Sequence, residues 1–260
     1  MVTRPTAVAG SFYPGQRGRL TRELDTLFEQ ADRPPAQVSP ARVKAIVVPH
    51  AGYVYSGTTA ATGYELLRGR PINRVVVLGP THRVGIRGMD AFDTPLGSVP
   101  VDPDLTAIAE AVPLVVTRPD VHAREHSLEV QLPFIRTVLP QASVLPVAVG
   151  DALPDEVAAL LDAVWGESDT AIVISSDLSH YHSYDDARKL DAGTIDKVLA
   201  LDDTVAPNRA CGCFSLNGLL LASGEHHLTP TLLSVRNSGD TAGDKGRVVG
   251  YASFAFQADQ

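Results

Sequence analysis

Residues 43–52 read VKAIVVPHAG, an apolar run that ends in a proline, a histidine and a glycine. A short run rich in β-branched residues predicts a strand that is buried on both faces. Two further segments repeat the arrangement, RVVVLGPTH at residues 74–82 and AIVISSDLSH at residues 171–180. Each of these predicted strands is therefore followed, at its carboxyl end, by a turn that carries a histidine.

Helical patterns and further apolar runs alternate with these strands. We expect helices over residues 17–30, 56–67, 128–139, 153–164, 184–201 and 216–222, and strands over residues 143–149 and 248–256. In this scheme Ser56 caps the second helix. The alternation predicts an α/β fold, a three-layer α/β/α sandwich with a mixed central sheet. The proline-rich stretch at residues 34–40 is too short to separate domains, so we expect one domain over residues 1–260.

Composition narrows the class of protein. The formal net charge of −8 argues against nucleic acid or an anionic membrane as the main partner. The chain has 2 cysteines, too few for a secreted disulfide framework. No signal peptide is evident, and no apolar run approaches the ~20 residues of a membrane span. We therefore expect a cytoplasmic protein that does not enter a membrane.

The histidines at the strand ends form the first candidate site. Ligands of open α/β sheets bind beyond the carboxyl ends of the strands, so His50, His82 and His180 are expected to converge. A lone histidine in such a turn is more often an ordinary loop residue, but three in equivalent places favour a shared pocket. Two imidazoles and a thiolate would suit a borderline or soft divalent metal ion.

Cys211 and Cys213 are the only thiols that could complete such a site. In an extended Cys-Gly-Cys segment they face opposite ways, so at most one reaches the metal. The alternative is that both are small buried hydrophobic residues, which is the usual fate of free cysteine. Spacing alone leaves this choice open.

Residues 121–129, VHAREHSLE, hold a second polar cluster. Either Glu125 and His126 line the same pocket, with Ser127 capping the helix that follows, or the segment is an exposed loop and a helix start. Residues 175–177, SSD, do not indicate a serine hydrolase, because the chain has no G-x-S-x-G elbow. The common zinc and nucleotide motifs are absent as well.

Short motifs along the whole chain resemble those of the Memo family, whose bacterial and archaeal members are often called AmmeMemoRadiSam system protein B. The matching segments, in order, are RP at 4–5, AGSFYP at 9–14, PHAGY at 49–53, YSG at 55–57, LGPTH at 78–82, TPLG at 94–97, EHSLEVQLPF at 125–134, SSDLSH at 175–180, CG at 211–212, NSGD at 237–240 and VGY at 249–251. The family is similar in fold to the class III, LigB-type extradiol dioxygenases, which bind non-haem iron(II).

The resemblance implies a set of site residues. His50 and His82 match the two histidine ligands of the dioxygenases, and Cys211 stands in place of their carboxylate ligand. His180 matches the acid/base histidine of the pocket, and Asp177 and His126 are further pocket residues with catalytic roles. Cys213 has no counterpart in the motif.

The function implied is a metal-dependent oxidoreductase of dioxygenase type with an unknown small substrate. Iron(II) is the expected metal, with copper or zinc as alternatives, because a thiolate is softer than a carboxylate. A non-catalytic module that binds a peptide or a metal in the same pocket is the first alternative, and a zinc-dependent hydrolase is the second. The family name also suggests a functional link to a radical-SAM protein.

Overall fold

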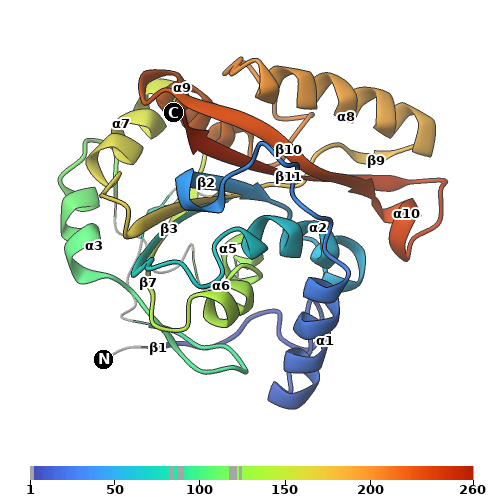
Figure 1. Ribbon diagram of the computed structural model, residues 1–260, viewed down its shortest axis with the longest axis horizontal. Helices are drawn as coiled ribbons and strands as arrows, with labels where there is room; N and C mark the ends of the chain where they lie inside the picture. Colours follow the sequence, from blue (N-terminus) through green and yellow to red (C-terminus); the bar gives the residue numbers. More distant parts are fainter. Residues whose placement is uncertain (1–2, 82–84, 87–90, 117–121, 123–124, 260) are drawn as a thin grey trace.

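A mixed sheet forms the centre of the protein in a computed structural model, which describes residues 3–81, 85–86, 91–116, 122 and 125–259 (Figure 1). Its strands are β2 (Val43–Val48), β3 (Arg74–Pro80), β4 (Gly85–Ile86), β7 (Ser143–Val149), β8 (Thr170–Ser175), β9 (His180–His182), β10 (Leu228–Asn237) and β11 (Val248–Ala258). The order along the sheet is β10-β11-β2-β8-β3-β7-β4, and β9 pairs with β11 outside this path. The middle strands β2, β8, β3 and β7 are parallel, whereas β11 is antiparallel to β2 and β10.

Helices cover both faces of this sheet. They are α1 (Arg17–Glu29), α2 (Tyr53–Glu65), α3 (Pro103–Glu110), α5 (His126–Glu129), α6 (Leu132–Val138), α7 (Pro154–Ala163), α8 (Tyr184–Leu199), α9 (Cys213–Glu225) and α10 (Ser238–Thr241), with a 3-10 turn at Pro40–Arg42. A small separate sheet joins β1 (Thr3–Arg4), β5 (Ala91–Phe92) and β6 (Val99–Pro100). No helix in the described ranges is both long and apolar enough to cross a membrane.

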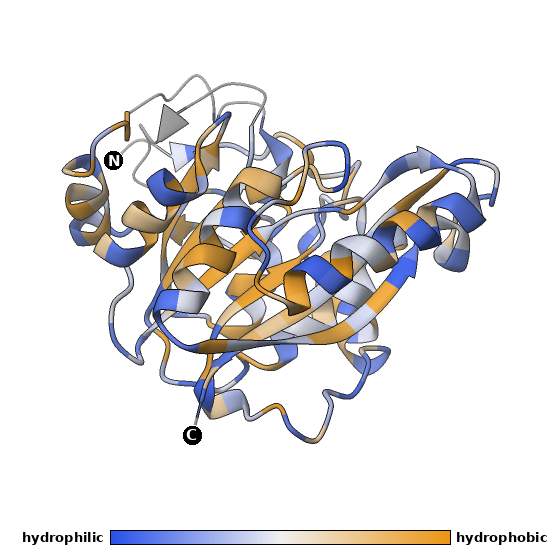
Figure 2. Cartoon of the chain, turned by 90° about the horizontal axis from the view of Figure 1, so that it is seen from above, coloured by the Kyte–Doolittle hydropathy of each residue, from blue (hydrophilic) through white to orange (hydrophobic). Residues whose placement is uncertain are grey.

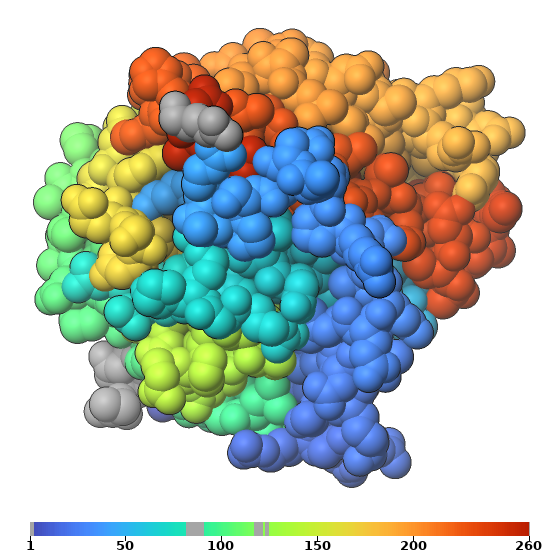
Figure 3. Space-filling model, viewed as in Figure 1, coloured from blue at the N-terminus to red at the C-terminus, as the bar shows by residue number. Residues whose placement is uncertain are grey.

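The alternation of side chains along β8 explains the three layers. Ala171 and Val173 belong to an apolar cluster with α1, α2 and α6, whereas Ile172 and Ile174 belong to a second cluster with α7, α8 and α9. Successive side chains of a strand point to opposite faces, so a continuous apolar run feeds two cores at once. Figure 2 shows this apolar character concentrated on the central strands. In the space-filling view α8 lies at the top of the molecule and α1 at the lower right (Figure 3). The predicted three-layer sandwich with a mixed sheet is confirmed.

Several predicted boundaries were wrong. The second helix begins at Tyr53 with Gly52 as N-cap, and Ser56 lies inside it, where its hydroxyl donates to the Ala51 carbonyl. The expected helix over residues 128–139 is two helices, α5 and α6, with Pro133 in the first turn of α6, where proline is tolerated. The expected helix over residues 216–222 extends over all of α9. Strand β10 was missed because polar residues and Pro230 interrupt its pattern, which an edge strand tolerates.

A close approach at Gly212 fixes the turn that precedes α9 against the end of β8. A Cβ atom on Gly212 would lie 2.6 Å from the Ser175 carbonyl oxygen and 2.7 Å from the Cβ of Ser176. The Gly212 amide also donates to the Ser176 hydroxyl at 2.9 Å. The turn therefore presses against the end of β8, and Cys211 is held next to Asp177, whose carbonyl accepts the Cys211 N–H at 3.3 Å.

A buried ion pair attaches the N-terminal segment to α5. Arg4 Nη1 and Glu129 Oε2 are 2.5 Å apart, with side-chain exposures of 1% and 0%. The Glu129 carboxylate also accepts the amides of Ala7 and Val8 and, at 2.7 Å, the hydroxyl of Tyr13. A buried charge is tolerable only when it is paired and hydrogen-bonded in this way.

Substitution of Gly212 tests the close approach. We expect Gly212→Ala to lower the free energy of unfolding by about 1–3 kcal/mol, because the new methyl group has to displace the backbone of β8. Urea denaturation measures this change. The matched control is Gly224→Ala in the last turn of α9, where a Cβ meets no atom within 4 Å. The control should keep or gain stability by up to ~1 kcal/mol; equal losses in the two variants would contradict the packing.

Substitution of Glu129 tests the buried ion pair. Glu129→Gln leaves the Arg4 charge buried without its counter-charge, so we expect a loss of about 3–5 kcal/mol in the free energy of unfolding. The control is Glu65→Gln, which breaks an Arg68–Glu65 pair whose side chains are 40% and 41% exposed. An exposed pair contributes at most ~1 kcal/mol. If guanidinium denaturation gave the same loss for both variants, the buried pair would not hold the N-terminal segment.

Candidate metal centre

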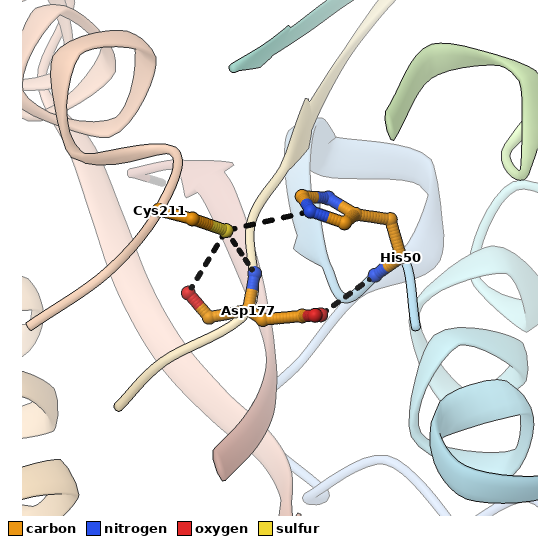
Figure 4. A group of neighbouring side chains, drawn as sticks. All are labelled: His50, Asp177 and Cys211. Atoms are coloured by element: carbon orange, nitrogen blue, oxygen red, sulfur yellow. Dashed lines mark hydrogen bonds between the residues drawn. The ribbon is translucent and has the colours of Figure 1, made fainter. Parts of the chain in front are cut away.

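Three side chains meet beyond the carboxyl ends of β2 and β8. His50 follows β2, Asp177 follows β8, and Cys211 lies in the turn before α9. One ligand atom from each of these residues lies within 4.8 Å of the other two. Figure 4 shows the Cys211 and His50 side chains directed toward one another, with Asp177 beside them. Because β2 and β8 are parallel neighbours, residues that follow them are brought to the same edge of the sheet.

Short contacts connect the three residues. His50 Nε2 and Cys211 Sγ are 3.4 Å apart. The Asp177 carboxylate accepts the backbone N–H of His50 at 2.8 Å, and Cys211 Sγ accepts the backbone N–H of Asp177 at 3.3 Å. His50 and Asp177 are buried, and Cys211 is partly exposed.

The surroundings keep the thiol and the imidazole neutral. Burial, and next the charge of Asp177, raise the pKa of the Cys211 thiol to about 12. Burial also lowers the pKa of the His50 imidazole, although the Asp177 charge opposes this shift. Both directions follow from the cost of placing a charge in a space withdrawn from water. A cation placed among these atoms would find a neutral nitrogen, a sulfur and an anionic carboxylate as donors.

The separation of nitrogen and sulfur fits a metal ion. Ligands at about 2.0–2.1 Å for nitrogen and about 2.3 Å for sulfur lie roughly 3.1–3.6 Å apart when their angle at the metal is between a right angle and a tetrahedral angle. The observed 3.4 Å between His50 Nε2 and Cys211 Sγ falls in this range. Histidine, cysteine and aspartate are together suited to iron, copper or zinc.

The other predicted site residues lie around this cluster or outside the described chain. His82, predicted as the second histidine ligand, is outside the described residues, so its role stays a prediction. His180 begins β9 and pairs with Val249, and its charge is close enough to lower the pKa of His50. Its ring nitrogens are not among the clustered ligand atoms.

His126 lies beside His50. The two rings are 5.6 Å apart in an edge-to-face arrangement, and the Phe12 ring is 4.8 Å from His126. His126 therefore lies next to His50, and α5 begins at this residue. Ser127 does not cap the helix, however: Glu125 is the N-cap and accepts the Ser127 N–H, while the Ser127 hydroxyl donates to Pro80.

The two cysteines have different environments. Cys211 faces His50. Cys213 begins α9, is 1% exposed and belongs to the apolar cluster formed with α7, α8 and α9. The Cys-Gly-Cys segment is a turn and a helix start, so the expectation of an extended segment was wrong. The expectation that at most one thiol lies at the site holds, because helix formation turns Cys213 into the core.

Comparison with known proteins identifies the family of the chain. The family model described as Memo-like protein matches residues 4–255. Proteins named MEMO1 family protein are similar over their whole length: one from Aquifex aeolicus is 35% identical, covering 98% of this chain and 100% of the relative. Others from Ignicoccus hospitalis and Metallosphaera sedula are 34% and 33% identical, each covering 98% of this chain and 99% of the relative. The chain belongs to the Memo family.

Proposed function

We propose that the protein is a metal-dependent oxidoreductase of dioxygenase type that acts on a small substrate. His50 and Cys211, together with His82, are the proposed ligands of non-haem iron(II), with copper as the second choice of metal. The observation that carries the proposal is the 3.4 Å separation of His50 Nε2 and Cys211 Sγ, with the Asp177 carboxylate in the same cluster. When bound, the metal supplies redox chemistry that these side chains lack.

The side chains have separate tasks in this proposal. Asp177 accepts the backbone N–H of His50, so it fixes the turn that follows β2 and places negative charge next to the cation. His180 is the proposed acid/base residue, which holds or accepts a proton beside the reacting groups. Its loop is fixed by Asp191 of α8, whose carboxylate accepts the Ser179 N–H at 3.0 Å. His126 contributes a second imidazole ring next to that of His50.

Aromatic side chains support a small, partly apolar substrate. Tyr55 in the first turn of α2 is 39% exposed, and Tyr181, next to His180, is 64% exposed. Burial raises the pKa of the Tyr251 phenol, and Asp177, Tyr55 and Tyr181 add to the rise, so each of these three groups lies near Tyr251. Exposed aromatic rings of this kind provide apolar contact area at the entrance of a polar site.

The metal content of variants tests whether Cys211 is a ligand. We expect full-length protein purified without oxygen to carry about one iron or copper ion per chain, and Cys211→Ser to lower the content by at least about tenfold. Cys213→Ala is the matched control and should keep the wild-type content, because that thiol faces the core. Elemental analysis of the folded proteins gives the result. Loss of metal in both variants, or in neither, would contradict the role of Cys211.

Oxygen uptake tests the redox chemistry. We expect the iron-loaded protein, with ascorbate as electron donor, to consume oxygen faster than the same concentration of free iron. His180→Gln should keep the metal and lower the rate by about 10²-fold or more, the usual contribution of a positioned acid/base group. A Clark electrode measures the rate, and metal analysis is the control. Tightly bound zinc without oxygen uptake would favour a hydrolase, and a metal-free protein would favour a binding module; either outcome contradicts the proposal.

A further inference from the structure

A chain of buried polar groups extends from His50 into the apolar core. Ser175 at the end of β8, Gln131 before α6 and Tyr64 of α2 are each 0% exposed. Tyr64 donates its hydroxyl hydrogen to Gln131 Oε1 at 2.9 Å, and Gln131 Nε2 donates to Ser175 Oγ at 2.8 Å. Ser175 Oγ in turn lies 2.8 Å from His50 Nδ1. Buried polar networks are costly unless every member is satisfied, so their hydrogen positions are tightly constrained.

The Gln131 amide has only one orientation that suits its neighbours. Its Nε2 lies 3.0 Å from the carbonyl oxygen of Pro49, which can only accept a hydrogen bond. A flipped amide would place two acceptor oxygens against each other. The backbone carbonyl of Pro49 therefore fixes Nε2 as the group that donates to Ser175.

The hydrogen of the Ser175 hydroxyl is fixed as well. Ser175 Oγ lies 2.7 Å from the carbonyl oxygen of Ser127, which again can only accept. A hydroxyl has one hydrogen and two lone pairs, so its hydrogen points to Ser127 and one lone pair takes the Gln131 hydrogen. The remaining lone pair faces His50 Nδ1. The hydrogen bond between them exists only if Nδ1 carries the proton.

We infer that Ser175 is a positioning residue that holds His50 in the Nδ1-protonated tautomer and thereby leaves the Nε2 lone pair directed at Cys211. Two backbone carbonyls, those of Pro49 and Ser127, set the direction of every hydrogen bond in the network. A neutral imidazole coordinates a metal through its unprotonated nitrogen, and the partner of the other nitrogen selects which one that is. The consequence for metal affinity rests on the proposed function; the tautomer does not.

Ser175→Ala removes the only acceptor that Nδ1 has in the described part of the chain. Among the described residues the ring nitrogens then keep one hydrogen-bonding partner, the Cys211 sulfur on the Nε2 side, so we expect the proton to move to Nε2. Long-range proton–nitrogen NMR of metal-free protein at mildly alkaline pH distinguishes the two tautomers, and His50→Ala identifies the signal. The wild type should show Nδ1–H, and Ser175→Ala should show Nε2–H. Binding of Zn²⁺ alone, measured by competition with a chelator, should weaken by about 10–100-fold.

Two further variants distinguish positioning from general loss of structure. Ser253→Ala removes another buried hydroxyl of the same sheet, one without a hydrogen bond to the described residues, and should leave the tautomer and the Zn²⁺ affinity unchanged. Ser175→Thr retains the hydroxyl and should retain the Nδ1–H signal. An Nε2–H signal in the wild type, or an Nδ1–H signal that survives in folded Ser175→Ala, overturns the inference. A wild type with Nδ1–H that binds no metal would support the tautomer and contradict the proposed function, so the two failures are distinguishable.

Discussion

The close contact of a thiol, an imidazole and a carboxylate in a space withdrawn from water is the constraint on which the rest of the structure depends. Burial disfavours the charged forms of the thiol and the imidazole: it raises the pKa of Cys211 and lowers that of His50. They are held together by backbone contacts, since Asp177 accepts the His50 N–H and Cys211 accepts the Asp177 N–H. These contacts hold three possible donors of a metal ion within 4.8 Å of one another.

Contacts in the surrounding layers fix the positions of the three residues. Gly212 allows the turn before α9 to press on the end of β8, and Glu129 ties the N-terminal segment to α5. Through Phe12 and His126 that segment reaches the ring of His50. Rigid support of this kind is what a binding site needs when its ligand atoms must keep a fixed separation.

Much of this could be predicted from the sequence, because buried parallel strands have a clear signature. The apolar runs before His50 and Asp177 predicted the strands, and the strand-end argument placed His50 at the edge where ligands bind. Asp177 was named as a pocket residue by the family resemblance, and parallel pairing of β2 and β8 brings it next to His50. The position of Cys211 could not be derived this way, since spacing treated it and Cys213 alike. The packing of Gly212 on β8 and the start of α9 at Cys213 separate them. A contact between residues so distant in sequence leaves no local pattern. The Cys-Gly motif of the family selected Cys211, the thiol that lies 3.4 Å from His50 Nε2.

The hydrogen-bond network next to His50 could not be predicted from the sequence either, although one residue indicates that a buried polar group is present. Gln131 stands between apolar residues in a segment that packs on the sheet, where a polar side chain needs a partner. Nothing local shows that its partners are Tyr64 and Ser175. Strand β10 was missed for a different reason: Pro230 and polar residues interrupt its apolar pattern, which an edge strand tolerates.

X-ray absorption spectroscopy of the metal-loaded, full-length protein tests the central claim most directly. The claim is that the sulfur of Cys211 and the imidazole nitrogen of His50 share one metal ion. The spectrum should then contain a sulfur scatterer at about 2.3 Å together with nitrogen or oxygen scatterers at about 2.0–2.2 Å. A first shell of nitrogen and oxygen alone would show that the metal is bound elsewhere and would contradict the account.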